Sequence, residues 1–514
     1  MDNYTKEARS GVRIQAPVCD RQMNVDLGSD FSLSDYQPEI KRLLRVRAVV
    51  SPPDKYVGVG SAELSGAVDY CILYAGNDGA LYSATHTEEY SFGVPVEMTS
   101  EFDLGDGLIC DVEIQPETVV GRVASPRKLA LRCKLRADVR LYGTRAIEEA
   151  VDSEDAKALQ RLCGEAACAQ VFTGIGEPLA LEDEILFDAQ WSDLRVISAE
   201  GQVMVNEANA GSGCVNCRGE VYLKLLCCHE NGDATPTVQL RKLPFVQSVP
   251  VDGCEVNCDC TAHGMCSDLH VTVEDGRVLC DVNVKLQVRA QRNETACFTR
   301  DLYSTASESE TRYAELVLPK ALKCVNGNFS LNSTMTMEEL GIRAGTSVLD
   351  VSMQSGAIAL EREHGKFYLT GRCRCHLILS DGEDMSAQEF EVPFRYEIDG
   401  ADCDAVDYNA VVEPVSCRVR VDGERLSLDS ELAVSASIRG ESRVRVLSEA
   451  HFGEPVKRSA AVYTVCYPAK DDTLWSIAKK YHRPVNSVAD LNTLPGAASA
   501  DSPDSLAGVA YLLV

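Results

Sequence analysis

Gly66-Ala-Val-Asp-Tyr-Cys-Ile-Leu-Tyr74, Gly219-Glu-Val-Tyr-Leu-Lys-Leu-Leu-Cys227 and Gly371-Arg-Cys-Arg-Cys-His-Leu-Ile-Leu379 are three copies of one pattern. Their glycines lie 153 and 152 residues apart. A recurrence at a fixed period indicates repeated structural units. We therefore expect three modules of the same fold, each built around one of these segments.

Each copy is followed by a turn, then by a strand centred on Phe92, Phe245 or Phe394, and finally by a long alternating segment. A period of two over 13 residues predicts a strand with one buried face, which is typical of antiparallel sheets. The sequence thus predicts a mostly β protein. The expected inward residues are Leu129, Leu131, Cys133, Leu135, Ala137, Val139 and Leu141, then Val278, Cys280, Val282, Val284, Leu286, Val288 and Ala290, then Leu426, Leu428, Ser430, Leu432, Val434, Ala436 and Ile438.

The expected organisation follows from these patterns. Residues 1–30 form a lead-in segment, and a short helix begins near Pro38. Residues 146–165 are rich in helix formers and predict a connecting helix. Residues 304–315 predict a polar connection, and a brief helix is expected at 336–340. The predicted modules span 31–145, 166–303 and 320–452, and a separate C-terminal domain spans 461–514.

Composition narrows the functional classes. The chain of 514 residues carries 78 acidic and 50 basic residues, a net charge of −28. This charge repels phosphate backbones and anionic lipid, so we expect neither nucleic-acid binding nor direct membrane insertion. No apolar segment follows the N-terminus and no run of 18 apolar residues occurs, which favours a cytoplasmic location.

The C-terminal domain has a pattern of its own. Residues 462–466 predict a strand, a helix is capped at Asp472 or Thr473, Pro484 opens a second helix, and residues 509–514 close with a strand. The expected order is βααβ. This order resembles the LysM module, a small domain that commonly binds N-acetylglucosamine glycans such as peptidoglycan. The resemblance rests on the string Asp472-Thr-Leu-Trp-Ser-Ile-Ala-Lys-Lys-Tyr481 and on the pair Leu491-Asn492.

The three modules in turn resemble SPOCS domains of spore coat assembly proteins. The resemblance rests on Asp35-Tyr-Gln-Pro-Glu-Ile-Lys-Arg-Leu-Leu-Arg-Val46, on the glycine-led strand and on Asp301-Leu-Tyr-Ser-Thr305. SPOCS modules before a terminal LysM module resemble the SipL-like spore coat morphogenetic family. That resemblance implies a mother-cell protein at the forespore surface, whose LysM module binds the ATPase of the coat's basement layer.

Several polar residues of the C-terminal domain are candidates for contact with a partner or a glycan. The domain has a net charge of −1, against −27 for the rest of the chain, so it can approach an acidic partner that the rest would repel. A solvated helix face is the alternative interpretation of the basic residues. The candidates are Lys470, Asp471, Asp472, Thr473, Lys479, Lys480, Arg483 and Leu506; Trp475 is expected in the domain's core.

The chain has 22 cysteines, nine of them between Cys214 and Cys280. Two pairs of thiolates can bind zinc tetrahedrally, and Cys214, Cys217, Cys254 and Cys258 are the candidate ligands. The alternatives are oxidative cross-linking in a coat and buried thiols that act as small hydrophobic side chains.

No catalytic motif is present. The sequence has no phosphate-binding glycine loop followed by Lys, no Gly-x-Ser-x-Gly and no His-Glu-x-x-His. We therefore expect a non-enzymatic scaffold without a cofactor that docks through its C-terminal domain. A peptidoglycan-binding protein of the cell envelope is the alternative hypothesis.

Overall fold

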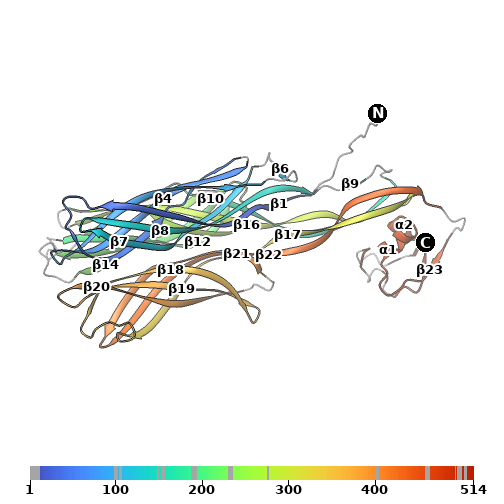
Figure 1. Ribbon diagram of the computed structural model, residues 1–514. Coiled ribbons are helices and arrows are strands. Elements are labelled where there is room, and N and C mark those ends of the chain that lie inside the picture. The colour runs from blue at the N-terminus through green and yellow to red at the C-terminus, as the bar shows by residue number, and fades with distance from the viewer. Residues whose placement is uncertain are drawn as a thin grey trace.

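The computed structural model is mostly β and consists of six antiparallel sheets followed by a small C-terminal segment (Figure 1). It describes residues 12–58, 60–97, 102–103, 107–147, 150–151, 157–186, 194–229, 236–274, 277–399, 405–457, 463–492, 494, 500–502, 506 and 508–514. The fold class expected from the alternating pattern is confirmed at this level. No helix among the described residues has the length and apolar character needed to cross a lipid bilayer.

The first repeat, defined here as residues 12–147, pairs two sheets face to face. One sheet contains β2 (Ile40–Val50), β3 (Asp54–Val57), β4 (Ser61–Gly76) and β5 (Leu81–Pro95). The other contains β1 (Val12–Ser32), β6 (Phe102–Asp103), β7 (Ile109–Ser125) and β8 (Lys128–Ile147). Buried side chains of both sheets form one core.

The second repeat (159–304) and the third repeat (307–455) follow the same plan. In the second, β12 (Leu194–Gly211), β13 (Cys214–His229) and β14 (Thr237–Pro250) face β10 (Leu159–Ile175), β11 (Leu179–Leu186), β15 (Asp259–Glu274) and β16 (Arg277–Ser304). In the third, β18 (Ser347–Glu363), β19 (Lys366–Ser380) and β20 (Met385–Ile398) face β17 (Ser307–Thr336), β21 (Ala405–Asp422) and β22 (Arg425–Pro455). The short β9 (Ala150–Val151) joins β22 in parallel.

The inward residues expected on the three long strands are all buried, with exposed fractions of 0–5%. This includes Ser430, whose hydroxyl donates to the sulfur of Cys417. The alternating pattern therefore identified the central strand of one sheet in each repeat, namely β8, β16 and β22.

Several expected elements between these strands are wrong. The connecting helix at 146–165 is absent from the described residues, where β8, β9 and the start of β10 lie instead. The lead-in at 1–30 contains β1, which pairs with β8 from Val12 to Ser32. A turn and then β2 replace the helix expected near Pro38. Residues 337–341 form turns instead of the brief helix expected at 336–340. Strand β17 begins at Ser307, inside the segment expected to be a polar connection. Pairing with a long neighbouring strand outweighs local helix propensity in these segments.

The glycine that begins each copy is explained by its cross-strand neighbour. Gly66, Gly219 and Gly371 lie opposite Tyr90, Phe245 and Phe394. A Cβ atom at Gly219 would lie 2.6 Å from Cζ of Phe245 and 2.1 Å from the carbonyl oxygen of Met204. The aromatic ring thus covers a position without a side chain. In the first repeat this aromatic residue is Tyr90, two residues before Phe92 on the same strand.

The three repeats contact one another in an elongated body, and the long strands β16, β17 and β22 reach toward the C-terminal segment (Figure 1). At one junction, equivalent residues of all three repeats form an apolar cluster. Register shifts leave Leu44, Ile197 and Leu349 out of the strand pairing, and these residues lie in that cluster. The cluster comprises Leu44, Leu73, Ala75, Leu81, Ile197, Leu226, Cys228, Leu349 and Ile378, with Met385 against it.

Next to this cluster, buried charges join the repeats. Arg45 of the first repeat lies 2.5 Å from Oε1 of Glu200 in the second and 2.7 Å from Oδ2 of Asp350 in the third. Nζ of Lys224 lies 2.5 Å from Oδ1 of Asp350. Burial alone would raise the pKa of Glu200, but Arg45, Lys224 and Arg47 outweigh burial and lower it to about 2. Glu200 therefore stays ionised inside the junction.

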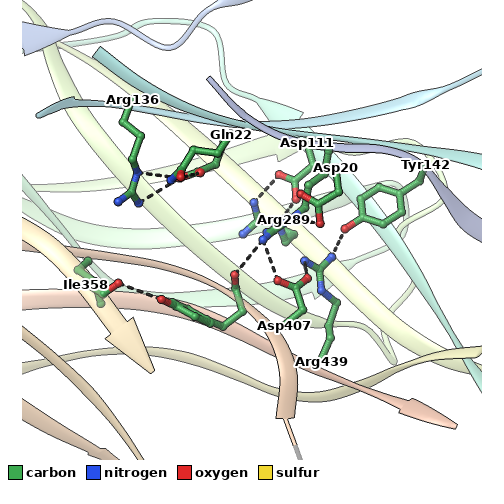
Figure 2. A network of polar contacts seen from close by, with 12 residues as sticks. Asp20, Gln22, Asp111, Arg136, Tyr142, Arg289, Ile358, Asp407 and Arg439 are labelled. Carbon is green, nitrogen blue, oxygen red and sulfur yellow. Dashed lines mark hydrogen bonds and ion pairs between the residues drawn. The ribbon is translucent and has the colours of Figure 1, made fainter. Parts of the chain in front are cut away.

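A second polar network joins the other sheets (Figure 2). Asp111 of the first repeat accepts two hydrogen bonds from Arg289 of the second, one of 2.9 Å from Nε. Arg439 of the third repeat donates to the hydroxyl of Tyr142 in the first, and Asp407 lies 2.7 Å from Arg140. Asp111 is fully buried, and this ion pair therefore fixes the first repeat to the second.

We expect Gly219→Ala to lower the free energy of unfolding by about 1 to 3 kcal/mol, because the new methyl group must displace backbone or the Phe245 ring. Urea unfolding measures this loss. Gly93→Ala is the matched control: its Cβ would meet no atom within 4 Å, so its effect should stay within about 1 kcal/mol. Equal effects of the two substitutions would contradict this explanation of the repeat glycine.

Asp111→Ala should cost about 3 to 5 kcal/mol, because it leaves Arg289 buried without its partner. Asp111→Leu combined with Arg289→Met should restore most of that loss. Glu315→Ala removes one of the two carboxylate partners of the exposed Arg443 and should cost at most about 1 kcal/mol. If Asp111→Ala cost no more than Glu315→Ala in urea unfolding, the buried pair would not join the repeats.

Candidate interaction site on the C-terminal segment

The C-terminal segment, residues 463–514, contains β23 (Val465–Cys466), α1 (Leu474–Lys480), α2 (Val485–Asn492) and β24 (Leu512–Leu513). Thr473 caps α1 in a reciprocal arrangement with Ser476, and this explains where the helix begins. The two strands pair antiparallel. The core includes Ile477, Val488 and Leu512, together with Tyr303 of the second repeat.

Asp301, near the end of β16, holds this segment against the second repeat. Its Oδ2 accepts a 2.8 Å hydrogen bond from Nε1 of Trp475, and its Oδ1 lies 2.6 Å from Nζ of Lys479. The hydroxyl of Tyr313 also donates to Oδ1, at 2.6 Å. Burial alone would raise the pKa of Asp301, but hydrogen bonds from Lys479, Trp475 and Tyr313 outweigh burial and hold it below its ordinary value.

Further contacts surround Asp301. The Tyr303 ring packs edge-on against Trp475 with centroids 5.0 Å apart, and its hydroxyl donates to the carbonyl oxygen of Arg483 at 2.6 Å. Nδ1 of His482 lies 3.0 Å from the carbonyl oxygen of Ser304. We call this set of contacts, Asp301, Tyr303, Ser304 and Tyr313 with Trp475, Lys479, His482 and Arg483, the seat of the C-terminal segment.

The seat changes the interpretation of the candidate residues. Lys479 pairs with Asp301 and its side chain is 30% exposed, while Leu506, only 7% exposed, packs in the segment's core, so both side chains have contacts within the protein. Trp475 is also 7% exposed. Asp472 accepts from the backbone N–H of Ala469 and stabilises the turn before α1.

The remaining candidates are spread over the surface. Lys470, Asp471, Lys480 and the Arg483 side chain are exposed, and Nζ of Lys480 lies over the ring of its neighbour Tyr481. Of the three basic candidates on and after α1, Lys480 and Arg483 are exposed and Lys479 pairs with Asp301.

A surface that sequence reasoning missed lies on the two-stranded sheet. Tyr463, Val465 and Tyr467 alternate along the chain and are 57%, 50% and 77% exposed. Tyr511, beside β24, is 57% exposed. The alternation with Thr464 and the buried Cys466 is the signal that could have revealed it. We call Tyr463, Val465, Tyr467 and Tyr511 the tyrosine face.

The candidate zinc ligands do not form a metal site. No group of three or more His, Cys, Asp or Glu side chains within the described residues is placed to hold a metal ion. Cys217 is 1% exposed, and burial raises its pKa to about 12. Burial also raises the pKa of Cys254, to about 11, with Cys258 adding to the shift. These values favour protonated thiols, as expected for small buried side chains.

A cavity of about 810 Å³ lies where the three repeats meet. Its lining is rich in titratable residues and includes Glu113 of the first repeat, His263 of the second and Glu413 of the third. Nε2 of His263 lies 3.4 Å from Oε1 of Glu113. Burial, and then the nearby Glu113, raise the pKa of Glu413 despite the opposing effect of His263. Burial therefore disfavours the ionised form of Glu413.

Comparisons with protein-family models, curated proteins and solved structures found no match for this chain.

The seat should weaken at low pH. Because the pKa of Asp301 is lowered in the folded state, its contribution to stability is complete above the ordinary pKa of about 3.9 and is lost as pH falls through the lowered value. In a Trp191→Phe background, Trp475 is the sole tryptophan. Its fluorescence should shift to longer wavelength as acid opens the seat.

Asp301→Asn should show the shifted spectrum already at neutral pH, because the amide cannot replace the charged acceptor of Lys479. Asp471→Asn, at an exposed position outside the seat, serves as the control and should retain the parent profile. A Trp475 spectrum that is the same in the parent and in Asp301→Asn at every pH would show that Asp301 does not hold the segment.

Proposed function

We propose that this protein is a non-enzymatic scaffold of spore coat assembly that acts in the mother-cell cytoplasm at the forespore surface. In this proposal the three repeats are SPOCS-like modules, and the C-terminal segment is a LysM-like module that docks on the ATPase of the coat's basement layer. The supporting observation is the seat: it fixes one side of the segment to the body, while the tyrosine face stays exposed.

The tyrosine face has the composition of a protein-binding surface. Tyrosine is enriched in interface centres because its ring buries much area at little entropic cost. Three of its four residues are tyrosines, each more than half exposed. The segment also carries a net charge of only −1, whereas the rest of the chain carries −27. Docking through the segment therefore reduces the electrostatic repulsion of an acidic partner.

A glycan-binding function is the second candidate, with peptidoglycan as the ligand. Tyr467, 77% exposed, precedes the turn that leads into α1, and exposed aromatic rings also suit sugar rings. The two functions predict different ligands for the full-length protein: the ATPase for the first and peptidoglycan for the second.

Immobilised full-length protein should retain the purified basement-layer ATPase, and Tyr467→Ser with Tyr511→Ser should reduce retention at least tenfold. Tyr56→Ser, an equally exposed tyrosine on β3 of the first repeat, is the matched control and should bind normally. Sedimentation with purified peptidoglycan without retention of the ATPase would replace the proposal with the second candidate.

Lys480→Glu with Arg483→Glu tests the basic side chains separately from the seat, since both are exposed and Arg483 takes part in the seat through its backbone carbonyl oxygen. We expect weaker ATPase retention, by about three- to tenfold, with an unchanged circular dichroism spectrum. Lys479 stays unaltered in this variant, because its reversal would break the contact with Asp301. Unchanged retention would limit the contact surface to the tyrosine face.

A further inference from the structure

Glu113, His263 and Glu413 lie close together in the cavity of about 810 Å³ where the three repeats meet. They come from β7 of the first repeat, β15 of the second and β21 of the third. Successive side chains of a strand point to opposite faces of its sheet. All three side chains point away from the cores of their repeats, because the preceding residues, Val112, Ala262 and Val412, belong to those cores. We call Glu113, His263 and Glu413 the Glu–His–Glu cluster.

Glu113 pairs with His263, whose Nε2 lies 3.4 Å from Oε1 of Glu113. The other oxygen, Oε2, is buried and accepts no hydrogen bond within the described part of the chain. Arg289 also faces Glu113, but Asp111 accepts two hydrogen bonds from it. Lys55 donates to a backbone carbonyl oxygen at 3.1 Å. Loss of the proton from His263 would therefore leave Glu113 buried without a cation of its own.

Glu413 lacks such a partner. No described residue forms a hydrogen bond or an ion pair with its side chain. Arg47 faces it, but Nη1 of Arg47 lies 3.2 Å from Oε2 of Glu200. Burial raises the pKa of Glu413, and the charges of His263 and Arg47 oppose burial only in part. The protonated carboxyl group is thus the less costly form in the cavity.

His263 has the opposite preference. Burial alone would lower the pKa of His263, but Glu113 and Glu413 outweigh burial and raise it, although Arg289 opposes them. The charged imidazole of the second repeat is thus stabilised by carboxyl groups of the first and the third.

The other charges around the cluster have contacts elsewhere. The groups that face the cluster from the surrounding strands are Arg47 of β2, Lys55 of β3, Asp138 of β8 and Arg289 of β16. Of these, Asp138 lies 3.0 Å from Arg136. The remaining charged residues of the cavity wall are paired as follows: Arg45 with Glu200 and Asp350, Glu117 with Lys134, His376 with Glu389, and Arg372 and Arg374 with Glu391.

We propose that the Glu–His–Glu cluster is a proton-dependent contact that holds the three repeats together most firmly at mildly acidic pH and weakens as the pH rises. With His263 and Glu413 protonated, the cluster contains one imidazolium, one carboxylate and one neutral carboxyl group. After both protons are lost, two carboxylates face a neutral imidazole, and like charges in a buried place repel each other. This inference is independent of the proposed coat function and of the C-terminal segment.

Both groups act in the same direction. Because the pKa of His263 is raised in the folded state, its contribution to stability is complete below the ordinary value of about 6.5 and is lost as pH rises through the raised value. Because the pKa of Glu413 is also raised, its ionisation costs stability as pH rises above the ordinary value of about 4.3. That cost is complete above the raised value.

Native-state hydrogen exchange on the full-length protein at pH 5.5 and pH 8.5 tests the proposal. Protection factors correct for the intrinsic pH dependence of amide exchange and report local opening. We expect protection in β7, β15 and β21 to fall by about fivefold or more at the higher pH. Both pH values lie above the range in which Asp301 gains a proton, so the seat stays intact.

Glutamine at either titrating position removes one ionisation and keeps a polar side chain. Glu413→Gln should resemble the parent at pH 5.5 and show about threefold higher protection at pH 8.5, because no charge forms. His263→Gln should show lower protection than the parent at pH 5.5 and resemble it at pH 8.5. Glu63→Gln, at an exposed position of β4, is the control and should reproduce the parent at both pH values.

Two results would overturn the proposal. The first is protection in the three strands of the parent that does not change with pH. The second is a pH-dependent fall of equal size in the parent and in both glutamine variants. If circular dichroism shows that His263→Gln does not fold, Glu413→Gln alone decides, since glutamine is neutral like the protonated carboxyl group.

Discussion

Burial of charge between the repeats is the constraint on which the rest of the structure depends. Arg45 is almost completely buried and is neutralised only because Glu200 comes from the second repeat and Asp350 from the third. A buried arginine without these partners would cost several kcal/mol. The first repeat therefore depends on the other two for the partners of its buried arginine.

The same constraint makes the copies non-interchangeable. Arg45 and Asp350 occupy equivalent strand positions, opposite Leu73 and Ile378, which each lie seven residues after their glycine. The second repeat has Ser198 there, opposite Leu226. The apolar residues at the neighbouring register shifts, Leu44, Ile197 and Leu349, are similar in all three copies and form the buried cluster. The charged residues differ between copies and therefore determine which copy contacts which. The body thus has fixed faces, and the seat arises at a single place on it.

Much of the fold could be predicted from sequence because period-two alternation reports directly on burial. It succeeded for β8, β16 and β22, whose inward residues are all buried. It was overlooked in β1, where Met23, Val25, Leu27 and Phe31 alternate and pack against the first core. Residues 159–165 were assigned to a helix on propensity, but pairing with β16 decides their conformation. Local preference is a weak predictor where a long neighbouring strand supplies hydrogen bonds.

The site was less predictable because its contacts join distant parts of the chain. Lys479 has the pattern of a solvated helix residue, and only the structure shows that Asp301, 178 residues away, engages it. From sequence alone, a charged residue that forms a structural contact cannot be told from one that stays exposed to solvent.

Native-state hydrogen exchange on Arg45→Met tests most directly the claim that the three repeats form one body. Arg45 lies in β2, but its partners lie in β12 and β18. The account predicts faster amide exchange in all three strands, to a similar degree. Faster exchange confined to the first repeat, with β12 and β18 unchanged, would contradict it.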